Sequence, residues 1–297
     1  AKLIGKHSLE QERYEKLYNY YIGKHAICER KRSSDNIANN KIVCNHAKYI
    51  VDIAKSYLVG NPVAYSCSDG YDIEAVKNCF AVQDMPSLDA EFEKTMSIFG
   101  KAYELVYADE QSQPKSVCLP PSNTFIVYGA GVGEIPLYGI HYYKKRDIDG
   151  TVTGVCCIVC DREMIYTYEN TADSFLHMTM TNSQHHYFGK MPMVEYRNNE
   201  EKQGDFEQMI PLIDAYNILE SDRVNDKEQF VDAFLFLTGI DLDSEQAKKL
   251  KEERILMGYE GAAAQYLSKV MSESDIEVLK DSLKSDIHRF SMIPDLS

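Results

Sequence analysis

The sequence predicts an α+β protein with helices in its first hundred residues, an antiparallel sheet after them, and a long helix in its second half. Between residues 14 and 99, apolar residues recur at intervals of three and four, the period of amphipathic helices. From Ala102 the period changes to two, in runs separated by short turns, which is typical of an antiparallel meander. A further pattern of helical period extends from Phe206 to Leu237.

Helices are expected before the sheet at residues 8–22, 45–58, 71–82 and 87–99. Ser8 followed by Gln11 is a capping-box pattern that opens the first helix, and Gly23 ends it. Pro86 opens the last one. The residues VAYS (63–66), which follow a Gly-Asn-Pro turn, predict a short strand.

Strands are expected at residues 102–109, 124–129, 136–146, 151–160, 163–169 and 174–181. Segments such as SQPKS (112–116) and DIDG (147–150) are predicted to be the turns between them.

The pattern from Phe206 to Leu237 predicts one helix of about 32 residues, roughly 48 Å long. Its two ends are apolar, whereas residues 220–229 hold Val224 as their single apolar residue. Thr238-Gly239 is a helix-stop signal. Residues 240–271 should therefore form a separate small segment, in which Asp243 or Ser244 caps a short helix, before a last helix near 273–290.

Composition narrows the possible functions. With 44% hydrophobic and 26% charged residues, the chain can bury a substantial core, and no apolar run approaches the ~20 residues of a membrane span. The formal net charge of −14 argues against a module that clamps nucleic acid, because nonspecific affinity for phosphates comes from basic residues. The eight cysteines follow no disulfide framework and are expected to be reduced thiols.

No motif predicts catalysis, a cofactor or a metal. Cys157 and Cys160 form a CxxC pattern on a predicted strand, where side chains three apart point to opposite faces and cannot share a metal ion. The pair His185-His186 has no partner at ligand spacing. The segment GAGVG (129–133) fits a turn and not a nucleotide-binding loop. The chain is therefore not expected to be an enzyme.

Two segments carry a resemblance to a known family. They are NNKIVCNHAKYIVDIAKSYLVGNPVAYS (39–66) and MPMVEYRNNEEKQGDFEQMIPLIDAYNILESDRVNDKEQFVDAFLFLTG (191–239), the latter continued by DIEVLKDSLKSDIHRFSMIPDLS. Together they closely resemble the portal, or head–tail connector, proteins of tailed bacteriophages and prophages. The resemblance runs in matching order from about Tyr20 to the last residue and is looser over the meander.

The resemblance implies a ring, usually of twelve copies, at one vertex of the capsid. Double-stranded DNA passes through the ring without sequence specificity during packaging and ejection. The implied partners are the large terminase subunit, a head–tail adaptor, and capsid and scaffold proteins, with no membrane. The implied location is the virion, and the host cytoplasm during assembly. The motor of such systems is a separate ATPase, consistent with the absence of a P-loop motif.

The resemblance also implies a division into parts. Residues 1–204 would form the wing, 205–239 and 272–297 the two stem helices, and 240–271 the clip. The family's tunnel loop and crown would follow Ser297, so the chain is expected to be truncated.

Candidate site residues follow from this division. An acidic stem would repel phosphate and centre the DNA without binding it. The tunnel-facing candidates are Glu220, Asp222, Arg223, Asp226, Lys227 and Glu228. The candidates for contact with terminase or adaptor are Lys248, Lys249, Lys251 and Glu252 in the clip.

Two other interpretations remain open. The first is a structural coiled-coil protein that oligomerises through the helix at 206–237, although its apolar positions keep no heptad through 220–229. The second is a thiol or metal enzyme that uses the cysteines, which the strand geometry disfavours.

Overall fold

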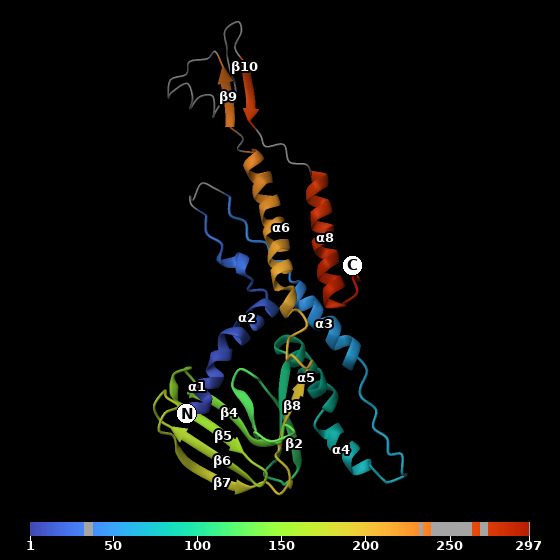
Figure 1. Ribbon diagram of the computed structural model, residues 1–297, viewed down its shortest axis with the longest axis vertical. Helices are drawn as coiled ribbons and strands as arrows, with labels where there is room; N and C mark the ends of the chain where they lie inside the picture. Colours follow the sequence, from blue (N-terminus) through green and yellow to red (C-terminus); the bar gives the residue numbers. More distant parts are fainter. Residues whose placement is uncertain (33–37, 232–233, 239–262, 268–272, 297) are drawn as a thin grey trace. The chain divides into compact units, whose positions relative to one another are not determined.

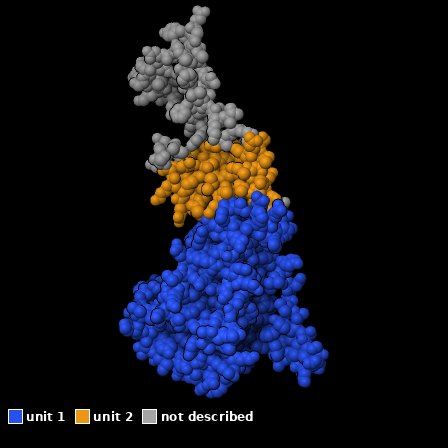
Figure 2. All heavy atoms as spheres, viewed as in Figure 1, with its two compact units in different colours: residues 1–25, 44–213, 286–297 blue, residues 26–43, 214–285 orange. Residues whose placement is uncertain are grey.

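The computed structural model describes residues 1–32, 38–231, 234–238, 263–267 and 273–296 (Figure 1). The chain divides into two compact units (Figure 2). Unit 1 consists of residues 1–25, 44–213 and 286–297, and unit 2 consists of residues 26–43 and 214–285. Both units are discontinuous in sequence.

Unit 1 begins with a helical segment that starts earlier than predicted. Helix α1 (Lys2–His7), a 3-10 turn (Ser8–Glu10) and helix α2 (Gln11–Tyr21) follow one another directly. The predicted capping box is wrong, because the backbone is already helical before Ser8 and its hydroxyl donates to the Gly5 carbonyl oxygen at 2.9 Å. Gly23 ends the segment with a positive φ of 85°, as expected.

The three following helices are confirmed. Helix α3 (His46–Val59) is capped by Asn45, whose side chain accepts a hydrogen bond from the Lys48 amide. Helices α4 (Glu74–Val82) and α5 (Met85–Phe99) follow it. The strand predicted at 63–66 is wrong. The apolar side chains of that segment stay exposed, and the structure pairs it with no strand among the described residues.

The predicted antiparallel meander is present as a five-stranded sheet in the order β3-β4-β5-β6-β7. Its strands are β3 (Thr124–Tyr128), β4 (Pro136–Arg146), β5 (Val152–Cys160), β6 (Met164–Asn170) and β7 (Thr179–His185). Strand β7 begins later than predicted. The Asn170 side chain donates to the carbonyl oxygens of Ser174 and Leu176 and holds the preceding residues in a loop.

A second sheet has the order β2-β1-β8 and is antiparallel throughout. Strand β1 (Lys101–Ala108) was predicted, whereas β2 (Pro114–Leu119) and β8 (Met193–Arg197) were not. Both missed strands are short edge strands that pair with β1. The turn predicted at 112–116 overlaps the start of β2, which begins with Pro114; an edge strand tolerates proline at this position.

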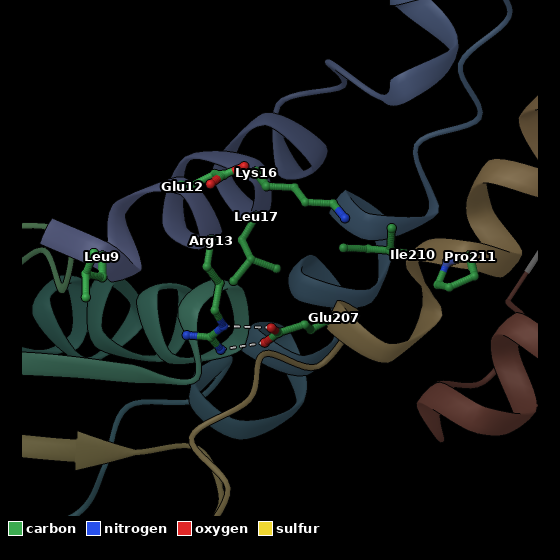
Figure 3. A pocket seen from close by; sticks show the side chains of 8 residues that line it. All are labelled: Leu9, Glu12, Arg13, Lys16, Leu17, Glu207, Ile210 and Pro211. Atoms are coloured by element: carbon green, nitrogen blue, oxygen red, sulfur yellow. Dashed lines mark hydrogen bonds and ion pairs between the residues drawn. The ribbon is translucent and has the colours of Figure 1, made fainter. Parts of the chain in front are cut away.

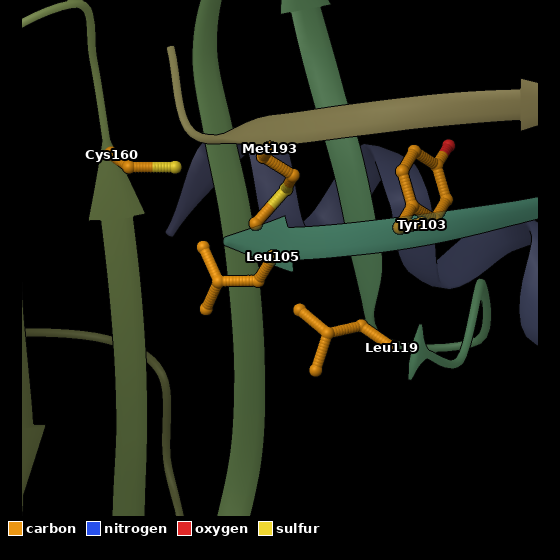
Figure 4. Packing of buried hydrophobic residues seen from close by; sticks show 5 residues of the cluster. All are labelled: Tyr103, Leu105, Leu119, Cys160 and Met193. Carbon is orange, nitrogen blue, oxygen red and sulfur yellow. The ribbon is translucent and has the colours of Figure 1, made fainter. Parts of the chain in front are cut away.

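Strand β5 separates two apolar clusters of unit 1. Cys160 packs with Tyr103, Leu105, Leu119 and Met193 (Figure 4). Cys157 belongs to a different cluster, with Ile4, Ile140 and Tyr142. The prediction that Cys157 and Cys160 point to opposite faces is therefore confirmed.

The long helix is shorter than predicted. A 3-10 turn (Glu207–Met209) leads into helix α6 (Ile210–Val231), and residues 234–238 form strand β9 (Phe234–Thr238). A single helix from Phe206 to Leu237 is therefore wrong. The run FLFLT is apolar and ends in a β-branched residue, and it pairs in antiparallel register with strand β10 (Ala263–Leu267). The predicted short helix after Asp243 or Ser244 lies outside the described residues.

The last predicted helix is confirmed as α8 (Glu273–Ser291). In the part of the chain that the structure describes, no helix combines the length and apolar character that crossing a membrane requires.

Candidate functional site

Among the described residues of unit 2, more polar than apolar side chains are buried. Its buried side chains, among those described, are two apolar ones (Ile27 and Tyr216) and three polar ones (Asn217, Ser221 and Asn225). The three polar residues are spaced four apart in α6, so they form one stripe along the helix. We call Asn217, Ser221 and Asn225 the polar stripe.

The polar stripe binds a segment from the start of the chain. We call residues 26–43 the arm; it contains a 3-10 turn (Ala26–Glu29) and is described at 26–32 and 38–43. The Ile42 amide donates to the Ser221 hydroxyl oxygen at 2.9 Å, and that hydroxyl donates to the Asn217 carbonyl oxygen at 2.7 Å. The Asn40 amide donates to Asn225 Oδ1 at 2.7 Å. Side chains of a helix thus satisfy the backbone of an irregular segment.

Two arginines of the arm hold a single carboxylate of α6. Arg30 Nη1 and Arg32 Nη2 donate to the same oxygen of Asp222, at 2.8 and 2.7 Å. Arg30 also donates to the Asn40 carbonyl oxygen at 2.8 Å, which links the two described parts of the arm, residues 26–32 and 38–43. Charge-assisted bonds of this kind are stronger than neutral ones. The basic arm therefore neutralises part of the acidic middle of α6.

Another side of α6 carries ion pairs to α8. Arg223 pairs with Glu277, and Lys280 lies 3.4 Å from Glu220. The residue numbers rise along α6 as they fall along α8, so the two helices are antiparallel.

The arm and α8 contact opposite sides of α6. Successive residues of an α-helix are about 100° apart. The mean direction of the residues that bind the arm (Ser221, Asp222, Asn225 and Glu228) is then about 160° from that of the residues that bind α8 (Glu220 and Arg223).

The six predicted tunnel residues therefore surround the helix and do not share a face. Glu220 and Arg223 bind α8. On the arm side, Asp222 binds the two arginines, and Glu228 accepts a hydrogen bond from the Asn40 side chain at 2.8 Å. The remaining two differ. Lys227 is exposed, and its direction on the helix lies between the directions of Glu220 and Arg223, on the side of α8. Asp226 lies on neither side, because its direction falls between the side that binds the arm and the side that binds α8.

The four predicted contact residues of the clip (Lys248, Lys249, Lys251 and Glu252) lie outside the described residues.

Within unit 1, an ion pair fixes the segment that leads into α6. Arg13 of α2 binds Glu207 through two parallel bonds, Nε to Oε1 at 2.7 Å and Nη2 to Oε2 at 2.6 Å (Figure 3). The same Nη2 donates to the Lys202 carbonyl oxygen at 3.0 Å. The pair lies in a half-open groove of about 500 Å³, lined also by Leu17, Ile210 and Pro211. Both groups hold the segment that leads into α6.

The buried thiols of Cys157 and Cys160 are poor nucleophiles. Burial raises the pKa of Cys157 to about 11 and that of Cys160 to about 12, so both remain protonated at neutral pH. Within the described ranges, no three or more His, Cys, Asp or Glu side chains are placed to hold a metal ion.

Sequence reasoning missed the polar stripe and its partners in the arm. A signal was present, because polar residues at positions i, i+4 and i+8 lie along one side of a helix and can bind one partner together. The position of their partners, about 180 residues earlier, had no local signal.

In the comparison with known proteins, one protein family matches the whole chain. The family described as "Phage portal protein, SPP1 Gp6-like" matches residues 1–297. The portal protein of Bacillus phage SPP1 is 28% identical over 255 residues, which cover 77% of this chain and 50% of that protein. The chain thus spans about half the length of this curated relative.

Two solved structures are similar at low sequence identity. One is the neck of an empty gene transfer agent (GTA) particle, which is 12% identical in sequence and has a TM-score of 0.48. The match covers 82% of this chain and 64% of that chain. The other is the virion of a native GTA particle, with 13% identity, 84% and 65% covered, and a TM-score of 0.44.

Proposed function

The chain belongs to the SPP1 Gp6-like family of phage portal proteins, and we propose that it is one subunit of a ring that conducts double-stranded DNA into and out of a capsid. The family match over residues 1–297 is the observation that carries this proposal. The ring would contain about twelve copies and would assemble in the host cytoplasm before it occupies the portal vertex of the virion.

The surface charge supports a conduit that does not bind DNA. The chain carries 46 acidic and 32 basic residues, so its surface releases few counterions from phosphate. Two of the bases, Arg30 and Arg32, are also occupied by Asp222. Of the six tunnel candidates, Asp226 is the one that makes no hydrogen bond or ion pair with the described part of the chain. We therefore place Asp226 first among the residues that would face the DNA.

The proposed division of the chain into wing, stem and clip follows from the family resemblance. Residues 1–204 would form the wing, 205–239 and 272–297 the stem, and 240–271 the clip. The clip would dock the large terminase subunit and the head–tail adaptor through Lys248, Lys249, Lys251 and Glu252. The antiparallel pair of α6 and α8 supports a two-helix stem. Strand β9, at the end of the first stem segment, pairs with β10 of the clip, which supports an element distinct from the stem helices.

Native mass spectrometry of the purified protein tests the ring. We expect one closed species of about twelve copies, and a monomer or a small coiled-coil oligomer would contradict the proposal. Electron microscopy of the same sample would show whether the species has a central channel.

Deletion of residues 240–271 tests the docking role. We expect the deleted protein to retain a folded unit 1 but to lose capture of the large terminase subunit in a pull-down. Capture at the level of the intact protein would exclude the clip as the docking site.

A further inference from the structure

Unit 2 exposes apolar side chains on two sides. Ile218 of α6 is 46% exposed, and Val278 and Leu279 of α8 are 69% and 51% exposed. The described residues of unit 2 include two buried apolar side chains, Ile27 and Tyr216, and they leave these three exposed. Contiguous apolar surface that is rimmed by polar groups marks interaction sites, and Val278 and Leu279 are adjacent on α8.

The two sides point in opposite directions. Ile218 is about 170° around α6 from the mean direction of Glu220 and Arg223, which bind α8. On α8, the contacts with α6 are made by Glu277 and Lys280. Val278 and Leu279 each point about 130° away from the mean direction of these two residues, on opposite sides of the direction that faces directly away from α6. One surface therefore lies beside the arm, and the other lies on the far side of α8.

The two sides also lie at the same level of the helix pair. The pairings Arg223–Glu277 and Glu220–Lys280 place Val278 and Leu279 level with residues 221–222 of α6. Ile218 is three or four residues away, about one helical turn. If neighbouring copies are related by rotation about an axis nearly parallel to the helices, the surface around Val278 and Leu279 of one copy meets the surface around Ile218 of the next at the same level.

The charges beside the apolar residues have opposite signs. On the arm side, Lys31 is exposed, and its neighbour Arg32 is already paired with Asp222, one turn from Ile218. Asp281, which is exposed, lies one turn from Val278 on α8. Each side thus combines an apolar centre with an exposed charge, Lys31 on one side and Asp281 on the other, and opposite charges favour association between unlike surfaces.

We propose that the outer face of α8 in one copy, centred on Val278 and Leu279, docks on Ile218 and on Lys31 in the described part of the arm of the next copy. Such a contact joins two different surfaces, is heterologous, and closes into a ring when the rotation between copies divides a full turn. The inference rests on the proposed function, since it requires that copies of the chain form a ring. It assigns the arm a role between subunits in addition to its contact with α6.

Cysteine cross-linking tests the contact in the assembled protein. With Ile218→Cys and Val278→Cys in the same chain, a short bismaleimide should produce a ladder of covalent multimers up to the full ring. Each single variant gives the background from the eight native cysteines. A mixture of the two single variants should add covalent dimers but no longer ladder, because each copy then carries one half of the contact.

Native mass spectrometry of the same samples separates the possible failures. A ring without cross-links above background overturns the inference and leaves the proposed function intact. Loss of the ring in the unmodified protein overturns both. Dimers formed by Ile218→Cys alone indicate a two-fold contact, and these also overturn the inference.

A charge introduced at the contact provides a second test. Ile218→Asp should raise the protein concentration needed for half assembly by about tenfold or more, the size of effect expected when a central interface residue is lost. Ile148→Asp is the matched control, since Ile148 is 100% exposed in the turn before β5 and should change assembly less than about twofold. Equal effects of the two variants would overturn the inference.

Discussion

Replacing Asp222 by asparagine should weaken the attachment of the arm to α6 without unfolding either unit. The side chain keeps its size but loses the charge that Arg30 and Arg32 share. Both arginines bind the same oxygen, Oδ1, so a single substitution weakens two ion pairs. The backbone bonds of Asn40 and Ile42 to the polar stripe remain, and the arm should therefore open more often but still close.

The size of the effect follows from the exposure of the three side chains. Asp222 is 43% exposed and Arg32 34%, and exposed ion pairs contribute about 0–1 kcal/mol. The Arg30 side chain is 16% exposed, so its bond is better shielded from water and should contribute more. We expect a total of about 1–2 kcal/mol, which corresponds to a roughly 5- to 30-fold increase in opening.

Amide hydrogen exchange at Asn40 and Ile42 measures this opening, because both amides are bonded to α6 side chains in the closed state. Asp226→Asn is the matched control: it removes the same charge one turn further along α6, and Asp226 has no bond to the described arm. If the amides of Asn40 and Ile42 exchange equally fast in Asp222→Asn and Asp226→Asn, then Asp222 does not hold the arm on α6.

Three other predictions follow from single positions. In assembled portals, Asp226→Lys should slow DNA passage at low salt and less so at high salt, since ions screen the added charge; Asp149→Lys in an exposed turn should not, and equal packaging rates would count against a tunnel position. Gly100→Ala should lower the free energy of unfolding by at least about 3 kcal/mol, because φ is 82° and the new Cβ would meet a backbone oxygen at 2.1 Å. Gly150→Ala, with φ of 81° and open space around it, should cost about 1 kcal/mol in a urea titration, and similar costs would show that the contact is not rigid. Burial holds the pKa of His7 below its usual value, so the unfolded chain binds that proton more tightly and the free energy of unfolding should fall as pH drops below about 6.5; a fall of equal size in His7→Gln would exclude His7 as its source.

The periodic parts of the fold were predictable from the sequence. Helix α3 has its apolar face, its Asn45 cap and a terminating Gly60, so local signals agree with one another. Side chains three apart on a strand point to opposite faces, so the opposite orientation of Cys157 and Cys160 could be predicted once residues 151–160 were assigned to a strand.

Elements that depend on a distant partner could not be predicted in the same way. Strand β8 is five residues long and exists through its pairing with β1, about 90 residues earlier. The run FLFLT fits either a helix or a strand, and its pairing with β10 decides between them.

The candidate site was predicted less completely than the fold. The polar character of residues 220–229 was visible, but a polar helix can face solvent, a ligand or another segment of the same chain. The structure shows that Asp222 and Asn225 face the arm and that Glu220 faces α8. Which directions around α6 are covered depends on residues far away in the sequence.

The polar contact between the arm and α6 has a thermodynamic consequence. Unfolding raises the heat capacity where apolar surface becomes exposed to water and lowers it where polar surface does. The clusters around Tyr103 and Ile140 should therefore give unit 1 a steeply curved dependence of stability on temperature. The contact between the arm and the polar stripe buries mainly asparagine and serine, so it should contribute little to such curvature. Cooling or heating should then change the stability of unit 1 far more than that of the contact between the arm and α6.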